Sequence, residues 1–169
     1  MGILDGNPQK EPMHYGEVFG AWSYLLGVKS MIASYQTCVN HTGDGDLKNL
    51  LEEAIQMAKE EEKEVEALLK ENGVAIPPAP PERAEANLDD IPTGARMMDP
   101  EIGAMLSTNT AKGLIACSTI MGESIREDIG LLFGRFHMGK AKFGLKALRL
   151  MKEKGWLVPP PLHVHTTGE

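Results

Sequence analysis

One amphipathic stretch near the end of the chain most constrains how this protein can fold. Between Ser124 and Lys154 apolar residues recur at steps of three, four or seven: Ile125, Ile129, Leu132, Phe136, Phe143, Ala147, Leu150 and Met151. This spacing follows the 3.6-residue period of an α-helix and leaves one apolar stripe. Ser124 and Glu127 have the spacing of a capping box, and Gly155 predicts the helix end. Such a long helix cannot bury its stripe alone, so the remaining chain must supply partners.

Three further segments show the helical period, and we expect helices at about 12–42, 47–72 and 100–122. Pro12 and Pro100 are predicted first-turn residues, and Asp46 is the predicted N-cap of the second helix. One unbroken helix from 99 to 154 would be about 80 Å long, which a compact domain of this size does not accommodate. We therefore expect a tight turn near Gly122 between the third and fourth helices.

The periodicity disappears between Val74 and Met98, where prolines cluster. About 25 extended residues can reach over 40 Å, enough to run the length of a helix. A connection of this length permits a crossover that leaves the flanking helices parallel. The sequence therefore predicts an all-α fold: a ferritin-like four-helix bundle in which two helical hairpins are joined by a long proline-rich crossover between helices two and three.

The domain organisation follows from the same pattern. We expect a flexible tail at 1–11, the four-helix bundle at 12–158, and a C-terminal tail rich in proline and histidine at 159–169. The formal net charge of −7 argues against nucleic acid as a partner. No apolar run approaches the roughly 20 residues that span a bilayer, and the N-terminus lacks the apolar core of a secretory signal.

Polar residues at matching heights on the apolar stripes are the candidate site. The central ones are Lys29, Glu61, Asn109 and His137, one on each predicted helix. We hypothesise a layer in which Lys29 pairs with Glu61 and Asn109 or His137 completes the hydrogen bonds. The alternative is that each side chain extends outward to water. Glu17 and Arg126 are expected at one bundle end, as a structural ion pair.

Metal and catalytic chemistry are weakly indicated. Di-iron bundles place Glu and Glu-x-x-His ligands at the centre, whereas a lysine at Lys29 would repel a cation. His41, Asp44, Asp46 and the His163-x-His165 pair could converge at one end, but such tail histidines bind metals adventitiously. Cys38 and Cys117 fall on apolar faces and are expected in the core. We therefore expect no catalytic residue, no metal site and no cofactor.

Several stretches together resemble a known family. They are Glu17…Trp22, 72–82 (NGVAIPPAPPE), 99–102 (DPEI), 125–129 (IREDI) and KGWL…PP from Lys154 to Pro161. Over about 12–163 the chain resembles an uncharacterised ferritin-like family of spore-forming bacteria, in part designated as spore coat proteins and similar to the coat protein F-like group. The resemblance implies a four-helix bundle without established enzymatic activity.

Three functions remain open. The first is a structural or interaction protein of sporulation or the spore coat, which is not an enzyme and which associates with itself, as a homodimer for example, or with other coat proteins. It would be located in the mother-cell cytoplasm or the coat. The second is a ferritin-like metal-binding protein or oxidoreductase. The third is a carrier that holds a small ligand in a methionine-rich cavity between helices.

Overall fold

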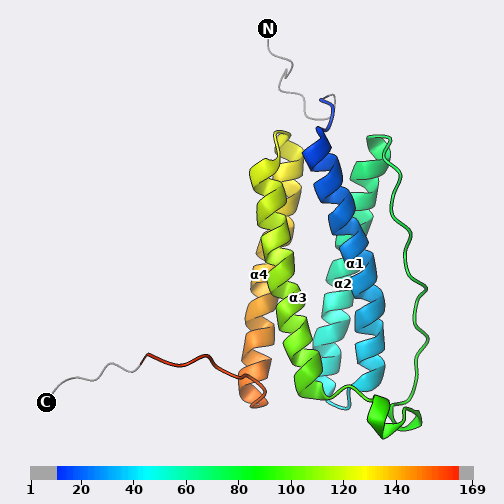
Figure 1. The fold of residues 1–169 in the computed structure, drawn as a ribbon, viewed down its shortest axis with the longest axis vertical. Helices are drawn as coiled ribbons and strands as arrows, with labels where there is room; N and C mark the ends of the chain where they lie inside the picture. The colour runs from blue at the N-terminus through cyan, green and yellow to red at the C-terminus, as the bar shows by residue number, and fades with distance from the viewer. Residues whose placement is uncertain (1–10, 164–169) are drawn as a thin grey trace, which may run out of the picture.

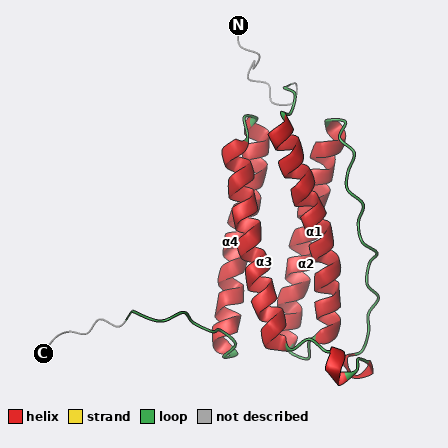
Figure 2. Cartoon of the chain, viewed as in Figure 1, coloured by secondary structure: helices red, strands yellow, loops and turns green. Residues whose placement is uncertain are grey.

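The computed structural model describes residues 11–163 of the chain. Its helices are α1 (Tyr15–His41), α2 (Gly45–Glu71), α3 (Asp99–Glu123) and α4 (Glu127–Glu153), with two 3-10 turns, η2 (Leu88–Asp90) and η3 (Thr93–Ala95), between α2 and α3. No strand occurs within 11–163. The long helices lie side by side as a four-helix bundle (Figure 2), which confirms the predicted all-α fold.

The bundle consists of two helical hairpins joined by a long crossover (Figure 1). α1 packs mainly against α2, and α3 packs mainly against α4. α1 and α4 run in one direction, and α2 and α3 run in the other. The segment between α2 and α3 passes along the outside of the first hairpin from one end of the bundle to the other. The predicted crossover is therefore present, and it makes α1 parallel to α4.

The first two helices begin at residues other than those predicted, because other side chains cap them. α1 begins at Tyr15 rather than Pro12, since His14 is its N-cap and His14 Nδ1 accepts the Gly16 N–H at 3.0 Å. α2 begins at Gly45, and Asp44 rather than Asp46 is its N-cap. Asp44 Oδ1 accepts the backbone N–H groups of Asp46 and Leu47, each at 3.0 Å.

The turn between α3 and α4 is confirmed, but the predicted capping box is wrong. Ser124 is the C-cap of α3 rather than the N-cap of α4, since its N–H donates to Ile120 O at 3.0 Å and its Oγ donates to the same oxygen at 2.6 Å. α4 begins at Glu127, after the N-cap Arg126, which forms no side-chain capping bond. The side chain that caps α4 comes instead from Glu17 on α1.

The ends of the chain are described in part. Most of the predicted N-terminal tail lies outside the described residues, but Glu11, assigned to that tail, is buried against the bundle. The predicted C-terminal tail is described as far as His163. Gly155, with φ +71°, follows α4 as predicted, since glycine adopts this left-handed conformation without a steric penalty. Within 11–163, none of the helices is both long and apolar enough to span a bilayer.

Candidate functional site

An ion pair between Glu61 on α2 and Lys140 on α4 lies at the centre of the bundle. Glu61 is 4% exposed and Lys140 is 8% exposed. Lys140 Nζ lies 2.8 Å from each carboxylate oxygen of Glu61. Tyr24 Oη on α1 donates to Glu61 Oε2 at 2.9 Å, and Cys117 Sγ on α3 lies 3.6 Å from Tyr24 Oη. All four helices therefore contribute to one connected polar cluster, which we call the central cluster: Tyr24, Glu61, Cys117 and Lys140.

Gly113 on α3 makes room for the side chain of Lys140. A Cβ atom at Gly113 would lie 2.8 Å from Lys140 Cδ and 3.0 Å from Lys140 Cε. These distances are below van der Waals contact, so only glycine lets the lysine stem pass α3 on its way to Glu61.

The aromatic residues of the core fix the other side of the cluster. The Tyr24 ring packs edge-on against Phe133 at 5.0 Å between centroids and is stacked with Phe136 at 6.1 Å. Burial raises the pKa of the Tyr24 hydroxyl, and it also raises the pKa of the Cys117 thiol. Both groups therefore stay protonated near neutral pH, and a buried protonated thiol is a poor nucleophile.

Lys29 does not pair with Glu61, so this predicted contact is wrong. Lys29 Nζ lies 2.7 Å from Glu66 Oε1 and donates to Pro77 O at 2.9 Å. Lys29 follows Tyr24 by five positions, which corresponds to a rotation of about 140° around the axis of α1. Because Tyr24 faces the centre of the bundle, Lys29 does not. Lys29 thus faces the flank of α2 and the crossover. The hydrogen bond from Lys29 to Glu66 is the main reason why the pKa of Glu66 is lowered.

The other two residues of the predicted layer lie outside the central cluster. Asn109 and His137 are half-buried, and in the described part of the chain neither hydrogen bonds to Glu61, whose partners are Tyr24 and Lys140. Burial raises the pKa of Tyr35 to about 12, and a hydrogen bond between Tyr35 and Asn109 offsets part of this increase. A polar centre exists, but Lys140 rather than Lys29 completes it.

Sequence reasoning also missed how the crossover is held. One face of α1 bonds to its backbone: Trp22 Nε1 donates to Ala75 O at 3.0 Å, and Asn40 Nδ2 donates to Ala84 O at 2.9 Å. Further along, Gln36 Oε1 accepts the Arg83 N–H, and Lys29 bonds to Pro77 as described above. Trp22, Lys29, Gln36 and Asn40 follow one another at seven, seven and four residues, a helical face that could have signalled this contact. We call this face the crossover seam.

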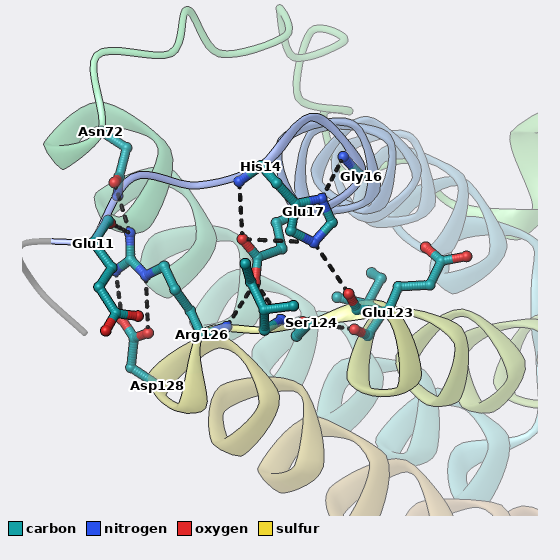
Figure 3. A network of polar contacts seen from close by, with 11 residues as sticks. Glu11, His14, Gly16, Glu17, Asn72, Glu123, Ser124, Arg126 and Asp128 are labelled. Atoms are coloured by element: carbon teal, nitrogen blue, oxygen red, sulfur yellow. Dashed lines mark hydrogen bonds and ion pairs between the residues drawn. The ribbon is translucent and has the colours of Figure 1, made fainter. Parts of the chain in front are cut away.

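Glu17 caps α4 at the end of the bundle near the start of α1 (Figure 3). Glu17 Oε1 accepts the N–H groups of Ile125 and Arg126 at 2.8 and 2.9 Å, and Oε2 accepts the His14 N–H at 3.1 Å. The carboxylate thus satisfies donors at the N-termini of both α1 and α4, where negative charge also complements the helix dipole. Glu17 and Arg126 meet at this end, but through the backbone of Arg126 and not through a side-chain ion pair.

The Arg126 side chain joins three other segments at the same end. It is 3% exposed, and its guanidinium binds both carboxylate oxygens of Asp128, at 3.1 and 2.7 Å. Nη1 also donates to Asn72 Oδ1 at 2.8 Å and to Glu11 O at 3.2 Å. These contacts tie the segment before α1, the end of α2 and the start of α4 together. The Arg126 hydrogen bond lowers the pKa of Asp128.

At the opposite end of the bundle, the described residues of the candidate metal site bind other partners. Lys154 Nζ lies 2.7 Å from Asp44 Oδ2 and 2.7 Å from Asp46 Oδ2, and its hydrogen bond lowers the pKa of Asp44. His41 Nδ1 accepts the Met97 N–H at 3.0 Å. Among the residues that the structure describes, no three His, Cys, Asp or Glu side chains lie close enough to hold a metal ion. His165 lies outside that range.

An open groove of about 600 Å³ lies between α1 and α3. Small residues form much of its wall, including Gly16, Gly20 and Gly27 on α1 and Gly113 on α3. Tyr24 and Lys140 of the central cluster also line it. Their polar atoms are engaged with Glu61, and most of the remaining wall of the groove is apolar.

The fold and its internally paired centre define the class of this molecule as a four-helix bundle protein with a crossover between its hairpins. The family model "Protein of unknown function (DUF3231)" matches residues 1–167, and the chain belongs to this family.

The chain is similar to two relatives at high identity and to one more distant structure. The uncharacterised protein YvdQ of Bacillus subtilis strain 168 is 58% identical over 169 residues, which is 100% of this chain and 99% of that protein. The crystal structure of a protein of Bacillus halodurans C-125, named "a putative spore coat protein", is also 58% identical, with a TM-score of 0.92 over 94% of this chain and 99% of that one. A conserved hypothetical protein of Mycobacterium tuberculosis shares the fold at 12% identity, with a TM-score of 0.64 over 80% of this chain and 96% of its own.

Proposed function

We propose that this protein is a structural component of the bacterial spore coat that acts through contacts of its helix surfaces and has no catalytic role. The observation that carries the proposal is the spore coat designation of the solved relative, which is 58% identical and superposes with a TM-score of 0.92. The protein would be made in the mother cell and deposited on the developing spore, where its partners are copies of itself or other coat proteins.

The internal chemistry of the bundle supports a structural role. Glu61, Lys140 and Tyr24 are bonded to one another, so none presents a free acid, base or nucleophile to the groove. The ammonium group of Lys140 also occupies the centre, where di-iron bundles hold cations, and its charge disfavours a metal there. These contacts favour the structural role over a metal-dependent oxidoreductase.

Localisation tests the coat assignment directly. In a sporulating Bacillus host, the chain fused to a fluorescent protein is expected to form a ring around the forespore, and the untagged chain is expected in detergent extracts of purified spore coats. A cytoplasmic mother-cell protein fused in the same way is the control. Fluorescence that stays diffuse in the mother cell throughout coat assembly would overturn the proposal.

Elemental analysis tests the metal-dependent alternative. The untagged protein is incubated with iron, manganese or zinc, desalted and analysed by mass spectrometry. We expect far less than one metal ion per chain. A stoichiometric metal that survives desalting would favour an oxidoreductase or a metal store instead.

A further inference from the structure

The surface of the bundle has a charged side and a nearly uncharged side. α2 and α4 carry charged residues along their whole exposed length. The exposed positions of α1, by contrast, hold no Asp, Glu, Lys or Arg, and they are Tyr15, Phe19, Leu26, Gly27, Ser30 and Ser34. Surface helices ordinarily place charged residues on the side that faces water. The outer face of α1 therefore has the composition of a surface that is covered.

α3 continues this uncharged side. Between Glu101 and Glu123 its only charged residue is Lys112. Its exposed positions include Ile115, which is 67% exposed, and Met121. Phe19 on α1, which is 72% exposed, lines the groove between α1 and α3. Ile115 lies next to the groove wall, three residues after Lys112 and four before Thr119, which both line the groove. We call this side, formed by α1 and α3, the groove face.

The groove has the shape of a helix-packing surface. Gly20, Ser23 and Gly27 of α1 and Ala116 of α3 line it, so that a second helix can approach both backbones closely. Large apolar residues stand beside these small ones, which gives the ridges and hollows that interdigitate when helices pack.

The two charges on the groove face are self-complementary. Lys112 and Glu123 are eleven residues apart in the sequence, which is about three helical turns, so they lie on the same side of α3 about 16 Å apart. Both line the groove. Within the described chain, neither side chain has a hydrogen bond or an ion pair, since the contact of Glu123 is made by its backbone oxygen.

A two-fold axis satisfies both charges at once. If two copies of α3 cross antiparallel near residues 117–118, each Lys112 meets Glu123 of the partner subunit, and Ile115 lies close to the axis. In such an interface the same patch serves both copies, and the assembly closes as a dimer. The charges set the antiparallel register, and the apolar residues between them supply the buried area.

We propose that the groove face is the interface of a homodimer, in which the groove between α1 and α3 is filled by the same face of a second copy. This inference concerns the purified chain and does not depend on the spore coat assignment. Failure of the dimer and failure of coat localisation are therefore separate results.

The oligomeric state of matched variants tests the proposal. By sedimentation equilibrium, the wild type is expected at twice the monomer mass of 18.4 kDa. Ile115→Glu and Phe19→Glu place unpaired charges in the interface and are expected to sediment as monomers. Leu131→Glu is the control, because Leu131 is 70% exposed on α4, outside the groove face formed by α1 and α3, and this variant is expected to remain dimeric. All three positions are exposed, so circular dichroism should show unchanged helix content.

Charge reversal tests the register. Lys112→Glu and Glu123→Lys each bring like charges together, and each is expected to raise the dissociation constant about tenfold or more. The double variant Lys112→Glu/Glu123→Lys restores opposite charges and should return to within about threefold of the wild type. A wild type that stays monomeric at about 100 µM would overturn the dimer. So would Ile115→Glu and Leu131→Glu variants that sediment with the same mass as each other. A double variant no better than the singles would overturn the antiparallel register.

Discussion

Lys140 Nζ lies 2.8 Å from both carboxylate oxygens of Glu61, and this ion pair joins α4 to α2 across the centre of the bundle. Tyr24 from α1 donates to the same carboxylate. The pair is therefore held in place by packing and by a further hydrogen bond. Replacing such a pair as a whole by apolar residues is often nearly neutral, whereas removing one partner leaves a buried charge.

Breaking the pair on one side should be costly. Lys140→Met leaves the Glu61 carboxylate without its cation, and we expect the free energy of unfolding to fall by about 3–5 kcal/mol in urea denaturation. The double variant Glu61→Leu/Lys140→Met removes both charges and should recover most of that loss. Lys142→Met, at an exposed position of α4, is the matched control. If Lys140→Met cost no more than Lys142→Met, the ion pair would contribute nothing to stability.

Gly113 should be intolerant of even one methyl group. Alanine normally stabilises a helix interior relative to glycine by about 0.5–1 kcal/mol. At Gly113, however, the new Cβ would lie 2.8 Å from Lys140 Cδ, and the lysine cannot simply swing away because Glu61 holds its ammonium group. We therefore expect Gly113→Ala to destabilise the protein by about 1–3 kcal/mol.

A matched glycine separates this clash from helix propensity. Nothing lies within 4 Å of a Cβ built at Gly130 in α4, so Gly130→Ala should be neutral or stabilising. In the Glu61→Leu/Lys140→Met background, Gly113→Ala should lose most of its cost, which thermal unfolding of the combined variant would measure. An equal cost in both backgrounds would show that the Lys140 stem is not the reason for the glycine.

Glu17 should be critical for the start of α4. Glu17→Ala removes the acceptor of the N–H groups of Ile125 and Arg126, and we expect a loss of at least about 2 kcal/mol because each unsatisfied buried donor costs about 1–3 kcal/mol. Glu17→Gln keeps one oxygen and should cost less. Hydrogen exchange should speed up first at the amides of the α3–α4 turn. Glu52→Ala, on the exposed face of α2, is the control and should change neither quantity.

The four helices and the crossover could be predicted from the sequence because periodicity and proline clustering are local signals. The identity of the central cation could not. Lys29 and Lys140 both interrupt apolar stripes, and which of them reaches Glu61 depends on the rotation of each helix and on the gap at Gly113. Neither quantity can be read from one helix at a time.

The contact between Glu17 and Arg126 at the end of the bundle could also be predicted only in part. The heights of Glu17 and Arg126 along their helices place them together, and the structure brings them into contact. The bonded atoms, however, depend on the turn at Ser124, where the backbone N–H groups of Ile125 and Arg126 point at Glu17. The guanidinium is consequently free to bind Asp128, Asn72 and the segment before α1, which no spacing rule would assign.

Acid should destabilise the protein through carboxylates whose pKa values are lowered by ion pairs. Hydrogen bonds from Arg126, Lys154 and Lys29 lower the pKa values of Asp128, Asp44 and Glu66, respectively. A carboxylate whose folded-state pKa is depressed contributes stability that is present above its unfolded pKa, about 3.9 for Asp, and that is lost as the pH falls through the folded pKa. We expect the free energy of unfolding to fall steeply below about pH 4. Asp128→Asn, which cannot ionise, should start less stable at pH 7 and lose less stability between pH 5 and pH 2.5. Parallel acid profiles for the wild type and Asp128→Asn would mean that the Arg126–Asp128 pair does not contribute to the acid sensitivity.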